Sequence, residues 1–213
     1  LPAAQRTGQI AEIGHWVLAQ ACAQGAQWHE RYEGDPIVIG VNVSLYELLN
    51  TDYATTVTAA LNATGLPPTS LVLEIAEADL RGHRDVLPGK LRALLALGVR
   101  IEVDDFGLGQ ISLTELRELG FTGVKLDRSF IQLLDSGDPV SEAVLAALRL
   151  GRELGTLTVA EGVETWGQAH RLRSLGSVYA QGFLFGKPMP AEDLGSLIAA
   201  YRQLDVEELQ QPA

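Results

Sequence analysis

Hydrophobic residues follow two periods along the chain, that of strands and that of helices. Short runs rich in Val, Ile and Leu predict strands at 37–43, 71–75, 99–103, 121–125, 156–160 and 178–180. Apolar residues at helical spacing predict helices at 1–33, 45–63, 86–97, 113–119, 127–134, 140–154, 164–175 and 191–209. This alternation predicts a parallel sheet covered by helices, with too few strands to close an eight-stranded barrel.

Polar side chains gather where the predicted strands end. They are Asn42, Glu74, Asp104, Asp105, Lys125, Glu161 and Gln181. In a barrel of parallel strands this rim carries the active site. A single acid there could cap a helix, but several like charges repel one another unless cations lie between them. The pattern therefore indicates a site for two divalent ions.

The pair Asp104-Asp105 is the centre of this pattern. Neighbouring side chains of a strand point to opposite faces, so both acids can line one site only if the strand ends at them. The glycines of the segment 106–109 permit such an ending. The alternative interpretation is an Asp-rich turn with a local backbone hydrogen bond.

Charge and composition exclude some functions. The chain has 213 residues and a formal net charge of −11, which argues against nonspecific nucleic-acid binding because an acidic surface repels phosphates. It contains no apolar run long enough to span a bilayer and no signal-peptide pattern, so we expect no membrane contact by this domain. The single cysteine, Cys22, excludes an internal disulfide, and these features together predict a cytoplasmic location.

Six motifs carry a resemblance to a known family. They are Val41-Asn42-Val43-Ser44, Leu73-Glu74-Ile75-Ala76-Glu77, Asp104-Asp105-Phe106-Gly107, the segments 125–130 and 160–165, and the segment 181–188. In this order they resemble the motifs of EAL domains, and the resemblance spans residues 1–213 as a single domain. EAL domains are phosphodiesterases that hydrolyse the bacterial messenger cyclic di-GMP to linear pGpG. The resemblance implies a TIM-like (β/α) barrel and a two-metal site with Mg²⁺ or Mn²⁺.

The resemblance also implies metal ligands, residue by residue. Asn42, Glu74 and Asp104 would hold one ion. Asp104, Asp105 and Glu161 would hold the second, with Asp104 bridging the two. Such a pair of ions polarises a phosphate and activates a bound water.

Other site residues have rival explanations. By resemblance, Lys125 would orient or deprotonate the water or stabilise phosphate charge, but an ion pair with a neighbouring carboxylate fits the same position. Glu77 would tether the loop after Asp105. Glu164 would support the site, although acids are also favoured in a first helical turn. Gln181 would contact the substrate. Asp127 and Arg128 fall near the site too, and the start of a short helix explains both nearly as well.

Two departures from the family pattern concern activity. The glutamate that names the family would lie before residue 1, on the first of two strands missing from this sequence together with an arginine that contacts the nucleotide. Either residues have been omitted, which we favour, or the protein is a degenerate relative. The loop 108–112 also differs from that of active members. The alternative function is therefore a weakly active domain that binds cyclic di-GMP as a receptor. In either case we expect attached sensory or GGDEF-type domains, and the family's dimers suggest a homodimer.

Overall fold

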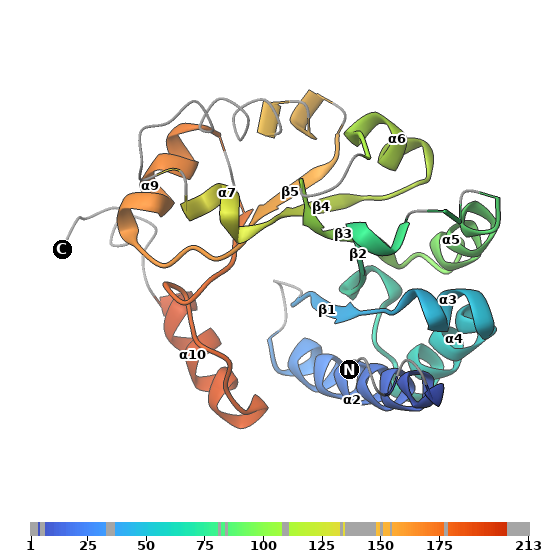
Figure 1. Ribbon diagram of the computed structural model, residues 1–213. Helices are drawn as coiled ribbons and strands as arrows, with labels where there is room; N and C mark the ends of the chain where they lie inside the picture. Colours follow the sequence, from blue (N-terminus) through green and yellow to red (C-terminus); the bar gives the residue numbers. More distant parts are fainter. Residues whose placement is uncertain are drawn as a thin grey trace.

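The computed structural model of the protein describes residues 4, 7–32, 37–80, 82–83, 85–107, 111–132, 134, 148–149, 151–153, 155–176 and 179–203. Within these residues a parallel sheet of six strands forms the centre of the molecule (Figure 1). The strands are β1 (Ile39–Asn42), β2 (Leu71–Ala76), β3 (Arg100–Phe106), β4 (Gly123–Leu126), β5 (Leu157–Ala160) and β6 (Tyr179–Ala180). Each strand pairs with the next one along the chain.

The sheet curls into a half-barrel with helices along its outer side, as Figure 1 shows. This arrangement confirms the predicted TIM-like fold in the form of a partial barrel. Each predicted strand corresponds to an observed one.

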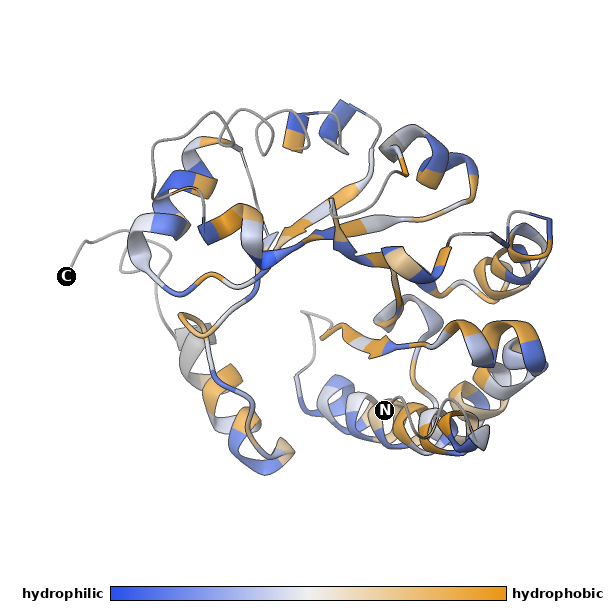
Figure 2. Cartoon of the chain, in the orientation of Figure 1, coloured by the Kyte–Doolittle hydropathy of each residue, from blue (hydrophilic) through white to orange (hydrophobic). Residues whose placement is uncertain are grey.

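Alternation along each strand separates the two faces of the sheet. On β2 the residues Leu73 and Ile75 are fully buried, and their register partners on β3, Ile101 and Val103, are buried with them under the helices. The residues between them, such as Glu74, are polar and point to the concave side. Blue and orange segments alternate along β3 in Figure 2. The outer face thus supplies the core, and the inner face carries polar groups.

The helices of the first half are α2 (Gln9–Arg31), α3 (Leu45–Asn50), α4 (Tyr53–Thr64) and α5 (Leu87–Leu95). The region 45–63, predicted as one helix, is divided at Thr51-Asp52. Ser44 and Glu47 form a capping box at the start of α3, and Asp52 accepts a hydrogen bond from the Thr55 amide at the start of α4. Each cap satisfies otherwise unpaired backbone amides and so fixes where its helix begins.

The second half contains α6 (Leu113–Glu118), α7 (Arg128–Gln132), α9 (Trp166–Ser174) and α10 (Ala191–Gln203). Most of the predicted helix 140–154 and the end of the predicted helix 191–209 lie outside the described residues. Among the helices that the structure describes, none is long and apolar enough to cross a membrane.

Candidate metal centre and substrate cavity

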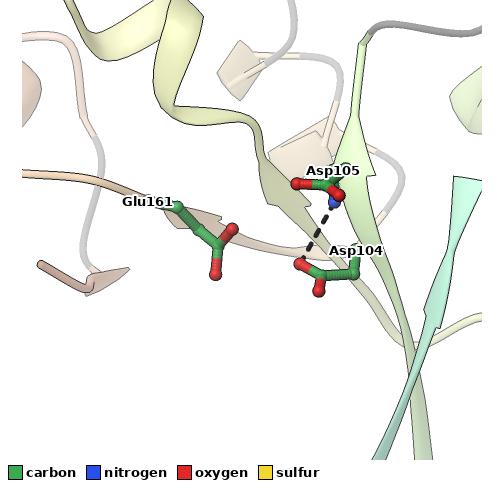
Figure 3. Close-up of side chains that lie close together, drawn as sticks. All are labelled: Asp104, Asp105 and Glu161. Carbon is green, nitrogen blue, oxygen red and sulfur yellow. Dashed lines mark hydrogen bonds between the residues drawn. The ribbon is translucent and has the colours of Figure 1, made fainter. Parts of the chain in front are cut away.

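Three carboxylates meet at the carboxyl edge of the sheet. Asp104 and Asp105 come from the end of β3, and Glu161 follows β5. One oxygen from each lies within 4.8 Å of the others, and Figure 3 shows the Glu161 carboxylate turned toward the two aspartates. The predicted convergence of these three acids is therefore seen in the structure.

The two aspartates face one site for a reason other than the predicted end of the strand. β3 does not end at them but continues to Phe106. Its pairing with β4 shifts register between Val103 and Phe106, and Asp105 has a φ of 52°. Among the described residues it is the one non-glycine with positive φ. A bulge of this kind re-aims side chains, so both carboxylates turn toward the rim.

A local hydrogen bond accompanies this geometry. The Asp105 amide donates to Asp104 Oδ1 at 3.1 Å, drawn as a dashed line in Figure 3. The alternative interpretation of the pair, a local side-chain-to-backbone bond, thus describes a real feature. It does not compete with a metal site, because it fixes one Asp104 oxygen and leaves the other able to accept a cation.

Burial and neighbouring acids make the Asp105 carboxyl harder to ionise than an ordinary aspartate. Burial, followed by the charges of Asp104 and Asp127, raises the pKa of Asp105. Asp127 behaves oppositely: burial would raise its pKa, but hydrogen bonds from Ser129 outweigh burial and lower it. The two acids line the same cavity but differ in how readily they ionise.

Lys125 connects the acids of three strands. Its Nζ lies 2.6 Å from Glu161 Oε1, 2.9 Å from Glu74 Oε2 and 3.5 Å from Asp104 Oδ1. Burial alone would lower the pKa of Lys125, but the Glu161 hydrogen bond and the Glu74 charge outweigh it, so the pKa rises. The lysine is therefore a fixed cation at the centre of the site, and the predicted ion pair is present.

The pKa of the Glu161 carboxyl reflects the negative charges around it. Burial raises its pKa, and the nearby charges of Asp104 and Glu74 act in the same direction. The ammonium of Lys125 opposes them without prevailing. One lysine therefore does not neutralise the cluster, which is the electrostatic condition under which an added cation is favoured.

Asn42 and Glu74 stand beside the cluster. They are register partners at the ends of β1 and β2, so their side chains emerge on the same face. Gly40, two residues before Asn42, leaves room for the Glu74 carboxylate: a Cβ on Gly40 would lie 2.1 Å from Glu74 Oε1. The sheet thus places both residues on the side where a first ion would be held together with Asp104.

Glu77 tethers the segment after Asp105. Its carboxylate accepts the Gly107 amide at 2.9 Å and the Ile111 amide at 3.3 Å. The Glu77 side chain is buried, in the short helix η2 (Glu77–Leu80) that follows β2. These bonds are those expected of the tethering role that the family resemblance implies.

A cavity of about 280 Å³ opens beside the acids. Its lining includes Asp105, Glu161 and three further residues from the predicted site: Asp127, Glu164 and Gln181. Asp127 Oδ1 also accepts a hydrogen bond from the Ser129 amide at 2.8 Å. Asp127 therefore both precedes the start of α7 and faces the cavity. For Glu164 the helix-start explanation is weaker, because Thr165 caps α9 with its own side chain.

Sequence reasoning placed Arg128 near the site but missed Phe183 and Glu102. Arg128 and Phe183 line the cavity, and Phe183 is 58% exposed although it is a large apolar side chain. Glu102 is buried on the inner face of β3, two residues before Asp104. Burial and then the charge of Glu74 raise the pKa of Glu102. Alternate residues of a strand lie on the same face, so the position of Glu102 two residues before Asp104 was the signal that could have identified it.

The donor set fits a hard divalent cation. Carboxylate and amide oxygens are the ligands that Mg²⁺ and Mn²⁺ prefer, and Asp104, Asp105 and Glu161 supply carboxylates within reach of one ion. Within the described residues this is the one group of three or more acidic, His or Cys side chains with that spacing. The cluster could therefore hold a metal ion.

A protein-family comparison decides the classification. The model of the EAL domain matches residues 1–188. The chain belongs to the EAL domain family. The EAL motifs quoted from the sequence therefore indicated the correct family, and the acids at the rim lie in the matched region.

Individual relatives agree with this classification. An uncharacterised signalling protein of Caulobacter vibrioides is 41% identical over 194 residues, which cover 91% of this chain and 23% of the relative. The bifunctional diguanylate cyclase/cyclic di-GMP phosphodiesterase MucR of Pseudomonas aeruginosa is 40% identical, over 93% of this chain and 29% of that protein. The chain thus spans about a quarter of the length of these curated relatives.

Solved structures show the same architecture. The MucR phosphodiesterase in complex with c-di-GMP superposes with a TM-score of 0.84 at 40% identity, covering 91% of this EAL domain and 78% of that chain. The EAL domain of Mycobacterium smegmatis DcpA gives a TM-score of 0.82 at 35% identity, covering 89% and 85%. The half-barrel described above is therefore an EAL-type fold.

Proposed function

We propose that this EAL domain hydrolyses cyclic di-GMP to linear pGpG with two divalent cations, Mg²⁺ or Mn²⁺. The observation that carries the proposal is the meeting of Asp104, Asp105 and Glu161 beside an open cavity. The 40% identity to the cyclic di-GMP phosphodiesterase MucR supports the choice of substrate.

The proposed ligands are those that the family resemblance implies, and the cluster of Asp104, Asp105 and Glu161 supports the second set. Asn42, Glu74 and Asp104 would hold one ion, and Asp104, Asp105 and Glu161 the other. When bound, the ions would polarise the phosphate and make a bound water more acidic. Asp104 shares the Lys125 ammonium with Glu74 and Glu161, which supports its assignment to both sets.

The remaining residues act on water and substrate. Lys125 would orient the attacking water or stabilise charge on the phosphate, since its ammonium is held at a fixed point among the ligands. Gln181 and Asp127 would contact the nucleotide from the cavity wall, and Glu164 would support that wall. Glu77 would hold the segment that carries Asp105.

The attached domains, the cellular location and the oligomeric state are also proposals. Because MucR combines a diguanylate cyclase with a phosphodiesterase, we expect sensory or GGDEF-type domains in the same protein. Its substrate is an intracellular messenger, so the site is expected to face the cytoplasm. A homodimer, as in other members of the family, would be tested by light scattering.

The experiment is turnover of cyclic di-GMP with Mn²⁺, followed by chromatography of the products. We expect pGpG to form, EDTA to stop its formation, and Glu161→Gln to lower the rate by about 100-fold or more, because it removes a proposed ligand. The matched control is Glu118→Gln, on the exposed end of α6, which should turn over normally.

Two outcomes would contradict the proposal. Normal rates in Glu161→Gln would remove the metal assignment. Tight binding of cyclic di-GMP without turnover, in the presence of Mn²⁺, would replace the hydrolase by the receptor function.

A further inference from the structure

The backbone at Asp105 and Gly107 has an uncommon conformation that something must hold. Asp105 has a φ of 52° and Gly107 a φ of 110°. For a residue with a side chain, positive φ persists only where the surroundings impose it. The direction of the Asp105 carboxylate depends on this backbone, so whatever fixes Gly107 also fixes Asp105.

One contact on Gly107 is polar. Its amide donates to Glu77 Oε2 at 2.9 Å. This bond restrains the Gly107 amide from the side of Glu77. A second restraint is needed to define the position of the segment.

The second contact is the aromatic ring of Phe130. A Cβ placed on Gly107 would lie 2.5 Å from Cε2 and 2.6 Å from Cζ of this ring. The ring therefore packs directly on the backbone of Gly107, at a distance that only glycine allows. Phe130 is partly buried against the core, so it is a supported surface for the segment.

The turn that carries Phe130 also touches the end of β3. The Phe130 amide donates to the Asp127 carbonyl at 3.0 Å, and the Asp127 amide donates to the Phe106 carbonyl at 3.3 Å. The Asp127 and Asp105 side chains also line the same cavity. The start of α7 thus meets the end of β3 at the backbone of the proposed ligand segment.

We propose that Phe130 is a positioning residue for the metal centre: its ring, pressed on Gly107, holds the Asp105 carboxylate where it binds a cation. The inference rests on the metal site of the proposed function. It adds a residue that touches neither ion nor substrate. Loss of the ring lets Gly107 move toward α7, and Asp105 then turns away from Asp104 and Glu161.

The test measures Mn²⁺ binding directly, from the electron paramagnetic resonance signal of free Mn²⁺, with no substrate present. Phe130→Ala is expected to weaken Mn²⁺ binding by about tenfold, the lower end of the effect of residues that orient metal ligands. Phe130→Leu keeps part of the packing surface and should show a smaller loss. Phe121→Leu is the matched control, because Phe121 is buried just before β4, at the opposite end from Lys125.

The outcomes separate this inference from a structural role and from the proposed function. If Phe130→Ala and Phe130→Leu bind Mn²⁺ like the unaltered chain while their melting temperatures fall, the ring is only structural and the inference is wrong. If the unaltered chain binds Mn²⁺ but does not hydrolyse cyclic di-GMP, the proposed function fails and graded losses at Phe130 still support the inference. If the unaltered chain does not bind Mn²⁺, the inference is overturned with the metal site.

Discussion

The two faces of the curled sheet are built from the same strands and serve different ends. The outer face of β2 and β3 carries Leu73, Ile75, Ile101 and Val103, all at most 1% exposed. The inner face of the same strands carries Glu74, Glu102 and Asp104. Burial of apolar area stabilises the first face, whereas the second collects like charges at a cost in stability. The apolar core on the outer face therefore offsets the charge repulsion that the acidic site on the inner face introduces.

The largest effect should come from Lys125→Met on the inner face. Removing the ammonium leaves Glu74, Asp104 and Glu161 without their counter-charge, which should lower the free energy of unfolding in EDTA by about 3 kcal/mol. Mn²⁺ should restore much of this loss, because a cation can neutralise the same acids. The measurement is urea unfolding with EDTA and with Mn²⁺, and the idea fails if Mn²⁺ stabilises the variant no more than the unaltered chain.

Leu73→Ala is the counterpart on the outer face. It opens a cavity under the helices and should cost about 2–3 kcal/mol of unfolding free energy, since Leu73 is fully buried. No cation can refill that space, so the loss should be equal in EDTA and in Mn²⁺ after the common stabilisation by metal binding is subtracted. A Mn²⁺-dependent recovery beyond that common stabilisation would erase the distinction between the faces.

The smallest effect is expected for Glu102→Gln, and it has the opposite sign. Burial raises the pKa of Glu102, so the folded state binds its proton more tightly than the unfolded state, and ionisation at neutral pH costs stability. The amide removes this cost and should raise the free energy of unfolding at pH 7, by less than either loss described above.

The pH dependence gives the check on this sign. Below the ordinary glutamate pKa of 4.5 the carboxyl is protonated in both states, and the gain from Glu102→Gln should vanish. Unfolding curves at neutral and acidic pH, in EDTA, make the measurement. A variant that is less stable than the unaltered chain at pH 7 would show that ionised Glu102 is a favourable partner of Lys125 or Arg100.

The sequence was most informative about the sheet, for a physical reason. A strand buried on one face repeats apolar residues with period two, as β2 does throughout and β3 does as far as Val103. The break between α3 and α4 was missed because both helices continue one apolar pattern. Only the N-caps Ser44 and Asp52 show that two separate helices begin here.

The sequence allowed the residues of the candidate site to be predicted, but not their arrangement in space. The rim positions of Asp104, Asp105 and Glu161 follow from strand ends alone. The bulge that turns Asp105 depends on pairing with β4 and on the Glu77 tether, contacts between residues far apart in the chain. Glu102 was missed because its burial requires the space left by Gly123 on β4, where a Cβ would lie 2.9 Å from the Glu102 Cγ.

The order of the strands bears on how the chain folds as it is synthesised. Because each strand pairs with the one that follows it, from β1 to β6, a newly made strand finds its neighbour already in place. The sheet can then lengthen sideways at the pace of translation, with few pairings that must wait for distant segments. Glu161, which follows β5, would be the last of the three clustered carboxylates to arrive, so the cluster could bind a cation only after β5 has joined the sheet.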